Sequence, residues 1–201
     1  MIEKDYWDLI REGNNEAFRK LYDEHTDMLY SYGMKIAQNH EVVEDAIQTV
    51  FLNIFERRKF ISRPDSIGAY LYTSLRNVIL CEMNKKEFSF LPLDEAFGGR
   101  DEQSDYDFKL EIDPCDILEL DEEERNRQKV LQQILDSLNG KQREIIYLRY
   151  YKGLSAKEVA SIFNTKDVQI NKAVLRIKKK LREQNVYDKV FITLILSMQN
   201  W

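Results

Sequence analysis

Residues 153–183, GLSAKEVASIFNTKDVQINKAVLRIKKKLRE, restrict the possible folds more than any other stretch of this chain. Ser155 and Glu158 have the S-x-x-E spacing of a capping box, in which each side chain accepts a hydrogen bond from a backbone N–H at a helix start. Asn164 follows, and asparagine adopts the left-handed conformation of a turn more readily than most residues. The stretch therefore predicts two short helices joined by a turn at Asn164.

The apolar residues of this stretch predict how the two helices pack. Ala160 is small enough for a second helix to cross close above it, and the buried positions fall on Val159, Phe163, Ile170 and Ala173. Two helices that cross steeply after a short turn form the helix-turn-helix arrangement, whose second helix enters the major groove of DNA.

The exposed residues of the second helix have the chemistry of DNA recognition. Gln and Asn side chains can read adenine edges, whereas Arg and Lys read guanine or bind phosphates. Lys178, Lys179 and Lys180 alone would indicate a solvated helix end, but here they belong to a helix-turn-helix. Leu175 is also expected at an exposed position of this helix. We therefore predict DNA contacts from Lys166, Asp167, Gln169, Asn171, Lys172, Arg176 and Lys179.

A net charge of −5 conceals a very uneven distribution of charge. Residues 87–124 contain 15 acidic and 2 basic residues, whereas the rest of the chain contains 20 acidic and 28 basic residues. The same segment contains two Pro and two adjacent Gly residues and has no helical periodicity, so we predict an acidic flexible linker over 87–123. Two interpretations stay open, a solvated spacer or a polyanion that occupies a nucleic-acid channel on a partner.

Apolar residues at helical spacing predict an all-α fold on both sides of this linker. Expected helices cover 3–11, 15–37, 40–58, 69–86, 124–138 and 140–151, with a loop over 60–68 and an Asn139–Gln142 capping box before the last of them. We predict two small helical domains, a four-helix domain over 1–86 and a helix-turn-helix domain over 124–184. For the apolar extension 185–201, packing, a regulatory or dimer interface and membrane-surface attachment stay open.

The fourth expected helix places aromatic and basic residues beside each other. Rings can stack on unpaired bases while cations hold phosphates, which is typical of single-stranded DNA binding. The candidates on and before this helix are Arg63, Tyr72, Arg76, Asn77 and Lys85. Alternatively, Tyr70 and Tyr72 only form the rim of a helical core.

Several function classes find no support in the sequence. The two Cys and two His residues share no ligand spacing, so we expect neither a metal site nor a disulfide. No phosphate loop, nucleophile elbow or acid–base pair is present, so we expect no enzyme activity, no cofactor and no small-molecule substrate. The longest apolar run, 190–198, is too short to span a bilayer, and we expect a cytoplasmic protein without stable membrane insertion.

Taken together, the two halves resemble a bacterial sigma factor of the extracytoplasmic-function group. VEDAIQTVFLNIFERR (43–58) is similar to the family's helix that docks on the clamp coiled coil of RNA polymerase. AYLYTSLRNVIL (69–80) is similar to the helix that holds the melted minus-ten element, with Tyr70 in place of the usual Trp, and 60–68 corresponds to the pocket for a flipped base. KQREIIYLRYYKGLSAKEVASIF (141–163) is similar to the domain that reads the minus-thirty-five element.

The resemblance implies roles for several residues. It assigns core-polymerase binding to Asp45, Gln48 and Phe51, and it assigns the two DNA-binding sets above to the minus-ten and minus-thirty-five elements. Gln169 and Ala173 depart from the residues that the family usually has in its recognition helix.

The resemblance also implies a transcription initiation factor whose partners are core RNA polymerase, promoter DNA and an anti-sigma protein. Its linker would occupy the polymerase's positively charged channels, and we expect that linker to screen the basic faces of the free protein. A stand-alone helix-turn-helix regulator and a sigma-like adaptor are the alternatives.

Overall fold

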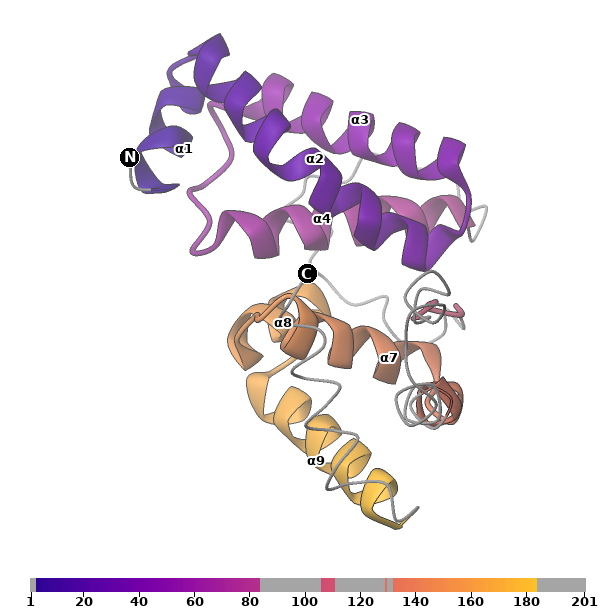
Figure 1. The fold of residues 1–201 in the computed structure, drawn as a ribbon. Coiled ribbons are helices and arrows are strands. Elements are labelled where there is room, and N and C mark those ends of the chain that lie inside the picture. Colours follow the sequence, from indigo (N-terminus) through magenta and orange to yellow (C-terminus); the bar gives the residue numbers. More distant parts are fainter. Residues whose placement is uncertain (1–2, 84–105, 111–128, 130–131, 184–201) are drawn as a thin grey trace, which may run out of the picture. The chain divides into compact units, whose positions relative to one another are not determined.

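The computed structural model describes residues 3–83, 106–110, 129 and 132–183. The chain divides into two compact units, the first ending at Ser104 and the second comprising most of the chain from Asp105 onward. Every regular element within these described residues is a helix (Figure 1), which confirms the all-α prediction. The extension 185–201, Lys85 and residues 124–128, 130 and 131 of the expected helix 124–138 lie outside the described residues.

The first unit contains α1 (Glu3–Arg11), α2 (Asn15–Ala37), α3 (His40–Arg57) and α4 (Ile67–Met83). Side-chain caps set the starts of α2 and α3, because Asn14 accepts a hydrogen bond from the Ala17 N–H at 2.9 Å and Asn39 accepts one from Val42 at 3.3 Å. Between them Gln38 ends α2 in the left-handed conformation, with φ at 53°. The fourth helix begins two residues earlier than predicted, since the Ser66 hydroxyl accepts from the Ala69 N–H and caps its first turn.

The core of the first unit lies where α2, α3 and α4 pack against one another (Figure 1). Gly33 permits this approach, since a Cβ there would lie 2.8 Å from Val43 Cγ1 and 3.2 Å from Ile79 Cδ1. Tyr32 and Tyr72 meet edge to face beside it, with ring centroids 4.8 Å apart. The remaining buried side chains include Leu29, Ile36, Ile47, Val50, Ile54, Leu71 and Leu75.

The second unit contains a helical segment at 132–136, α7 (Gly140–Ile146), the π-helix η2 (Tyr147–Tyr151), α8 (Ala156–Ile162) and α9 (Asp167–Glu183). The predicted Asn139–Gln142 capping box is present, with hydrogen bonds of 2.9 and 3.1 Å. The prediction of one α-helix over 140–151 is wrong in its last turn. There the Lys152 N–H bonds to the Tyr147 carbonyl, so the backbone widens into a π-helix.

The predicted helix-turn-helix features are present in α8, α9 and the turn between them. The Glu158 N–H donates to the Ser155 hydroxyl at 3.2 Å, and the Ser155 N–H donates to the Glu158 carboxylate at 2.8 Å. Asn164 takes the left-handed conformation expected of the turn, with φ at 47°. Ala173, predicted to be buried, is only half-buried, because Val174 and Ile177 take the inward positions of α9.

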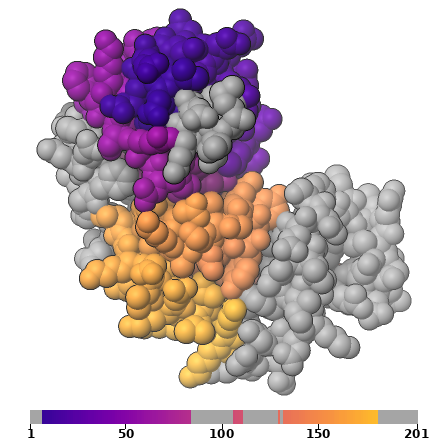
Figure 2. All heavy atoms as spheres, turned by 90° about the vertical axis from the view of Figure 1, so that its left-hand side faces the viewer, coloured from indigo at the N-terminus to yellow at the C-terminus, as the bar shows by residue number. Residues whose placement is uncertain are grey.

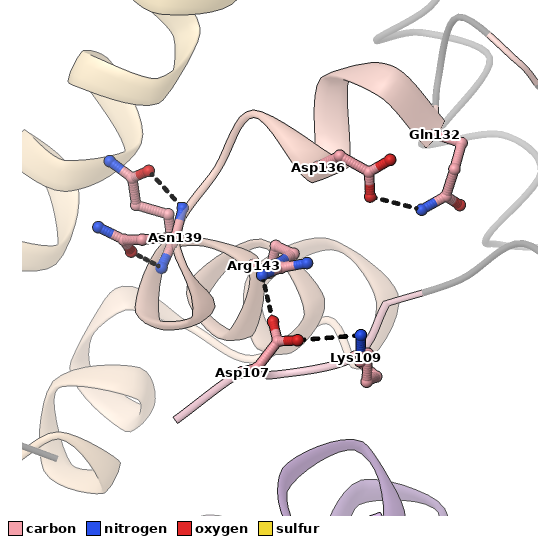
Figure 3. A network of polar contacts seen from close by, with 7 residues as sticks. Asp107, Lys109, Gln132, Asp136, Asn139 and Arg143 are labelled. Carbon is pink, nitrogen blue, oxygen red and sulfur yellow. Dashed lines mark hydrogen bonds and ion pairs between the residues drawn. The ribbon is translucent and has the colours of Figure 1, made fainter. Parts of the chain in front are cut away.

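A short piece of the predicted linker, residues 106–110, packs on α7 through Asp107 and Arg143 (Figure 3) and on η2 through Phe108 and Tyr147. Asp107 accepts hydrogen bonds from Arg143 at 2.5 Å and from Lys109 at 2.9 Å. The Tyr106 hydroxyl donates to the Glu144 carboxylate, and the rings of Phe108 and Tyr147 lie 5.5 Å apart. The acidic composition of 87–123 did not indicate this packing, which depends on aromatic residues that alternate with charged ones.

This network makes a pH-dependent contribution to stability at Asp107. The hydrogen bond from Lys109, together with the positive charge of Arg143, holds the pKa of the Asp107 carboxyl below its ordinary value of 3.8. The folded-state pKa is thus the lower one, so the stabilisation is present above the ordinary pKa and is lost as the pH falls through the folded-state pKa.

We therefore expect Asp107→Asn to lower the free energy of unfolding by up to about 1 kcal/mol at neutral pH, as for a half-exposed ion pair. The difference from the unsubstituted chain should shrink once the pH falls below about 4. Urea unfolding of the two chains between pH 7 and pH 3 measures it. A difference that stays constant down to pH 3 would contradict this assignment.

Candidate nucleic-acid interface

The outward face of α9 is polar and basic. Gln169, Lys172, Arg176 and Lys179 follow one another at helical spacing, and all of them are exposed. Their counterparts on the inward face are Ile170, Val174 and Ile177, which are at most 8% exposed. The inward face packs on α7, so the outward residues point away from the unit's core. Figure 2 shows α9, in yellow, at the surface of its unit.

All seven residues predicted to contact DNA in this unit are exposed. Lys166 lies in the turn, and Asp167 begins the helix, where its carboxylate accepts a hydrogen bond from the Val168 N–H at 2.8 Å. A carboxylate at a helix N-terminus is stabilised by the helix dipole. Asp167 therefore has a local capping role whether or not DNA is bound.

Two lysines near the end of α9, Lys178 and Lys180, are held within their own unit. The Lys180 ammonium donates to the Ser137 carbonyl, which ties the end of α9 to the turn before α7. The Lys178 ammonium lies 5.9 Å from the centroid of the Tyr150 ring. The cations of α9 that remain candidates for DNA contact are therefore the more exposed ones, Lys172, Arg176 and Lys179.

Sequence reasoning missed Val168 as a candidate for DNA contact. Its side chain is 54% exposed, and Leu175, two helical turns later, is 65% exposed. Apolar side chains on a recognition helix can contact the methyl group of thymine. The signal in the sequence was that Val168 and Leu175 each precede an inward residue, Ile170 or Ile177, by two positions, which is about 200° around the helix.

The residues predicted to bind single-stranded DNA do not gather on one exposed face. Arg63 is exposed and pairs with Asp8 at 3.1 Å, whereas Asn77 is half-buried. Tyr72 is 1% exposed and Arg76 is 3% exposed. Tyr72 therefore occupies a packing position in this structure, and base stacking by its ring would require α4 to repack.

The outward face of α3 combines polar and apolar residues. Asp45 and Gln48 are exposed there, and at the same helical spacing Leu52 is 57% and Phe55 is 37% exposed. Phe51, the third residue predicted for polymerase binding, is 3% exposed. Its ring supports this face from beneath through contacts with Phe18 and Tyr22.

No group of three or more His, Cys, Asp or Glu side chains among the described residues is placed to hold a metal ion. Of the helices in the described part of the chain, none combines the length and apolar character needed to cross a membrane.

Comparison with protein families decides the identity of these two helical units. Residues 21–88 match the family description "Sigma-70 region 2", and residues 128–181 match "Sigma-70, region 4". This chain belongs to the sigma-70 family. Region 2 thus covers α2 from Leu21 onward, α3 and α4, and region 4 covers α7, η2, α8 and α9 as far as Leu181. Helix α1 and residues 106–110 lie outside both matches.

Curated relatives place this sigma factor in the extracytoplasmic-function (ECF) group and confirm the resemblance. It is 26% identical over 179 residues to the ECF RNA polymerase sigma factor BldN of Streptomyces coelicolor, covering 84% of this chain and 60% of that relative's length. It is 27% identical over 146 residues to SigL of Mycobacterium tuberculosis, covering 71% of this chain and 74% of SigL. It is 24% identical over 180 residues to SigW of Bacillus subtilis, covering 87% and 92%.

Solved structures share the fold of this sigma factor. CnrH in complex with the cytosolic domain of CnrY has a TM-score of 0.55 at 17% identity, covering 93% of this chain and 99% of CnrH. The sigma factor RpoE in complex with the anti-sigma factor NepR from Bartonella quintana has a TM-score of 0.54 at 22% identity, covering 86% and 98%.

Proposed function

We propose that this chain is a transcription initiation factor that binds core RNA polymerase and directs it to specific promoters. The observation that supports this most is the exposed basic and polar face of α9 in a helix-turn-helix, in a chain that also matches region 2. Arg and Lys at the outward positions have the reach and charge to bind guanine or phosphates. In this role α9 reads the minus-thirty-five element from the major groove.

The polymerase-binding surface of this proposal is the outward face of α3. Exposed Leu52 and Phe55 supply apolar contact area there, while Asp45 and Gln48 supply hydrogen-bonding partners at the same face. An interface needs such an apolar centre with polar groups around it. The buried ring of Phe51 stiffens this surface, because it packs against Phe18 and Tyr22.

The first unit would open the minus-ten element, with Arg63 and Asn77 as the candidates whose side chains reach its surface. The factor would act in the cytoplasm, and an anti-sigma protein is proposed as its regulator, since both solved relatives were captured with a bound partner. In this role the chain performs no bond chemistry of its own.

Transcription with purified components tests the proposal directly. The chain is mixed with core RNA polymerase and a promoter library, and new transcripts are sequenced. A set of transcripts that share upstream elements and require the chain supports initiation. DNA binding without core polymerase and without transcripts would instead indicate a stand-alone helix-turn-helix regulator.

Substitutions on α9 provide a second prediction. Arg176→Ala or Lys172→Ala should weaken binding to the selected upstream element by roughly 1–3 kcal/mol if the side chain contacts a base. Holoenzyme binding to promoter DNA, measured by fluorescence anisotropy, gives the difference. Lys59→Ala is the matched control, because Lys59 is also an exposed cation but lies outside α9. An equal loss in all three variants would attribute the effect to net charge rather than to recognition.

A further inference from the structure

Residues 106–110 contact the second unit with backbone, aromatic and charged groups at once. Tyr106, Phe108 and Leu110 are each at most 8% exposed, whereas Asp107 and Lys109 alternate with them and stay partly exposed. The segment lies outside the residues that match region 2 and region 4, so membership of the family gives it no role. Its contacts are those of a bound peptide, although the peptide belongs to the same chain.

Gly140 shows that the surface beneath this segment is shaped to receive a backbone. A Cβ on Gly140 would overlap the Tyr106 carbonyl oxygen and lie 2.9 Å from the Phe108 nitrogen. Gly140 is the first residue of α7, where alanine would favour the helix more than glycine does. Glycine at position 140 therefore leaves room for the backbone of the segment, although alanine would be more favourable for the helix.

Two charged residues of α7 meet complementary groups of the segment. Glu144 has no exposed surface, and a buried carboxylate is costly unless a hydrogen bond satisfies it. The Tyr106 hydroxyl donates such a bond. Arg143, whose side chain is 13% exposed, pairs with Asp107 in the same way. These contacts select a hydroxyl followed directly by a carboxylate.

We propose that Gly140, Arg143, Glu144 and Tyr147 form a docking face for a short peptide of alternating aromatic and charged residues, and that Tyr106–Leu110 occupies it in this chain. Leu110 and Lys129, the described residues on either side of 111–128, belong to the same unit as α9. The intervening stretch 111–128 contains 8 acidic and 2 basic residues.

Limited proteolysis of the full-length chain tests the docking. Gly140→Ala should expel the segment, and chymotrypsin should then cut after Tyr106 and Phe108 about tenfold faster, because cleavage follows the population of the open form. Gly68→Ala is the matched control, since Gly68 also lies at the start of a helix and a Cβ there meets nothing within 4 Å. Cleavage after Phe60, which is 85% exposed, serves as the internal reference.

A second variant covers the case in which Gly140→Ala unfolds the unit. Asp107→Lys places a cation opposite Arg143 at a side chain that is 52% exposed, so it disturbs docking without disturbing the core. Mass spectrometry of the fragments and far-ultraviolet circular dichroism are recorded for every variant.

Faster cleavage at Tyr106 and Phe108 in a helical Gly140→Ala or Asp107→Lys chain, with Gly68→Ala unchanged, supports docking. Equal cleavage rates in all folded variants overturn it. The assay contains neither DNA nor polymerase, so its outcome is separate from that of the proposed function.

Discussion

Neutralising the acidic stretch between Leu110 and Lys129 should raise the affinity of the free chain for duplex DNA about tenfold at low salt. A tethered segment acts at an effective concentration of about 1 mM. If it binds the basic face of α9 with a dissociation constant of about 0.1 mM, it competes with DNA and lowers the apparent affinity for DNA about tenfold. The variant replaces six carboxylates by amides, at Asp116, Glu119, Asp121, Glu122, Glu123 and Glu124. Fluorescence anisotropy with a labelled duplex measures the change.

A control variant with the same change in charge distinguishes two effects: binding of the stretch 111–128 to the basic face of α9, and long-range repulsion of DNA by the chain's negative charge. Six carboxylates on the other side of the docked segment are replaced in the same way, at Glu87, Asp94, Glu95, Asp101, Glu102 and Asp105. Long-range repulsion of DNA should fall by a similar amount in both variants, and it should vanish as salt is raised. Equal gains in the two variants would refute a specific role for the stretch 111–128.

Leu52→Glu should weaken association with core RNA polymerase by about thirtyfold or more, the range of an interface hot spot. The side chain is 57% exposed in the free chain, so the substitution leaves the core of the first unit intact. A carboxylate at this place would be desolvated in the complex without a partner, which is costly. Association is measured by surface plasmon resonance without DNA.

Phe60→Glu is the control for this prediction, because Phe60 is also an exposed apolar residue of the first unit but lies after the end of α3. It should bind core polymerase as the unsubstituted chain does. If Leu52→Glu binds as tightly as the control and unfolds at the same urea concentration, the outward face of α3 is not the polymerase-binding surface.

The sequence by itself determined the features that depend on neighbours in the chain. Both capping boxes and the left-handed turn at Asn164 were predicted, because each involves residues only a few positions apart and a backbone geometry that few residue types favour. The outward face of α9 followed equally well, since an amphipathic helix with a fixed start orients every later side chain.

Only the tertiary structure decided which side chains of the first unit are available to partners. The sequence left open whether Tyr72 binds DNA or forms the rim of the core, and the structure buries its ring against Tyr32. Phe55 follows the apolar spacing of its helix, yet it is 37% exposed. Packing across α2, α3 and α4 makes that choice, and it depends on small residues such as Gly33 that no local pattern identifies. Docking of residues 106–110 likewise joins groups 36 and 38 positions apart, Asp107 with Arg143 and Tyr106 with Glu144. Contacts at such separations arise from the folded arrangement of several elements, which is why composition indicated only a linker there.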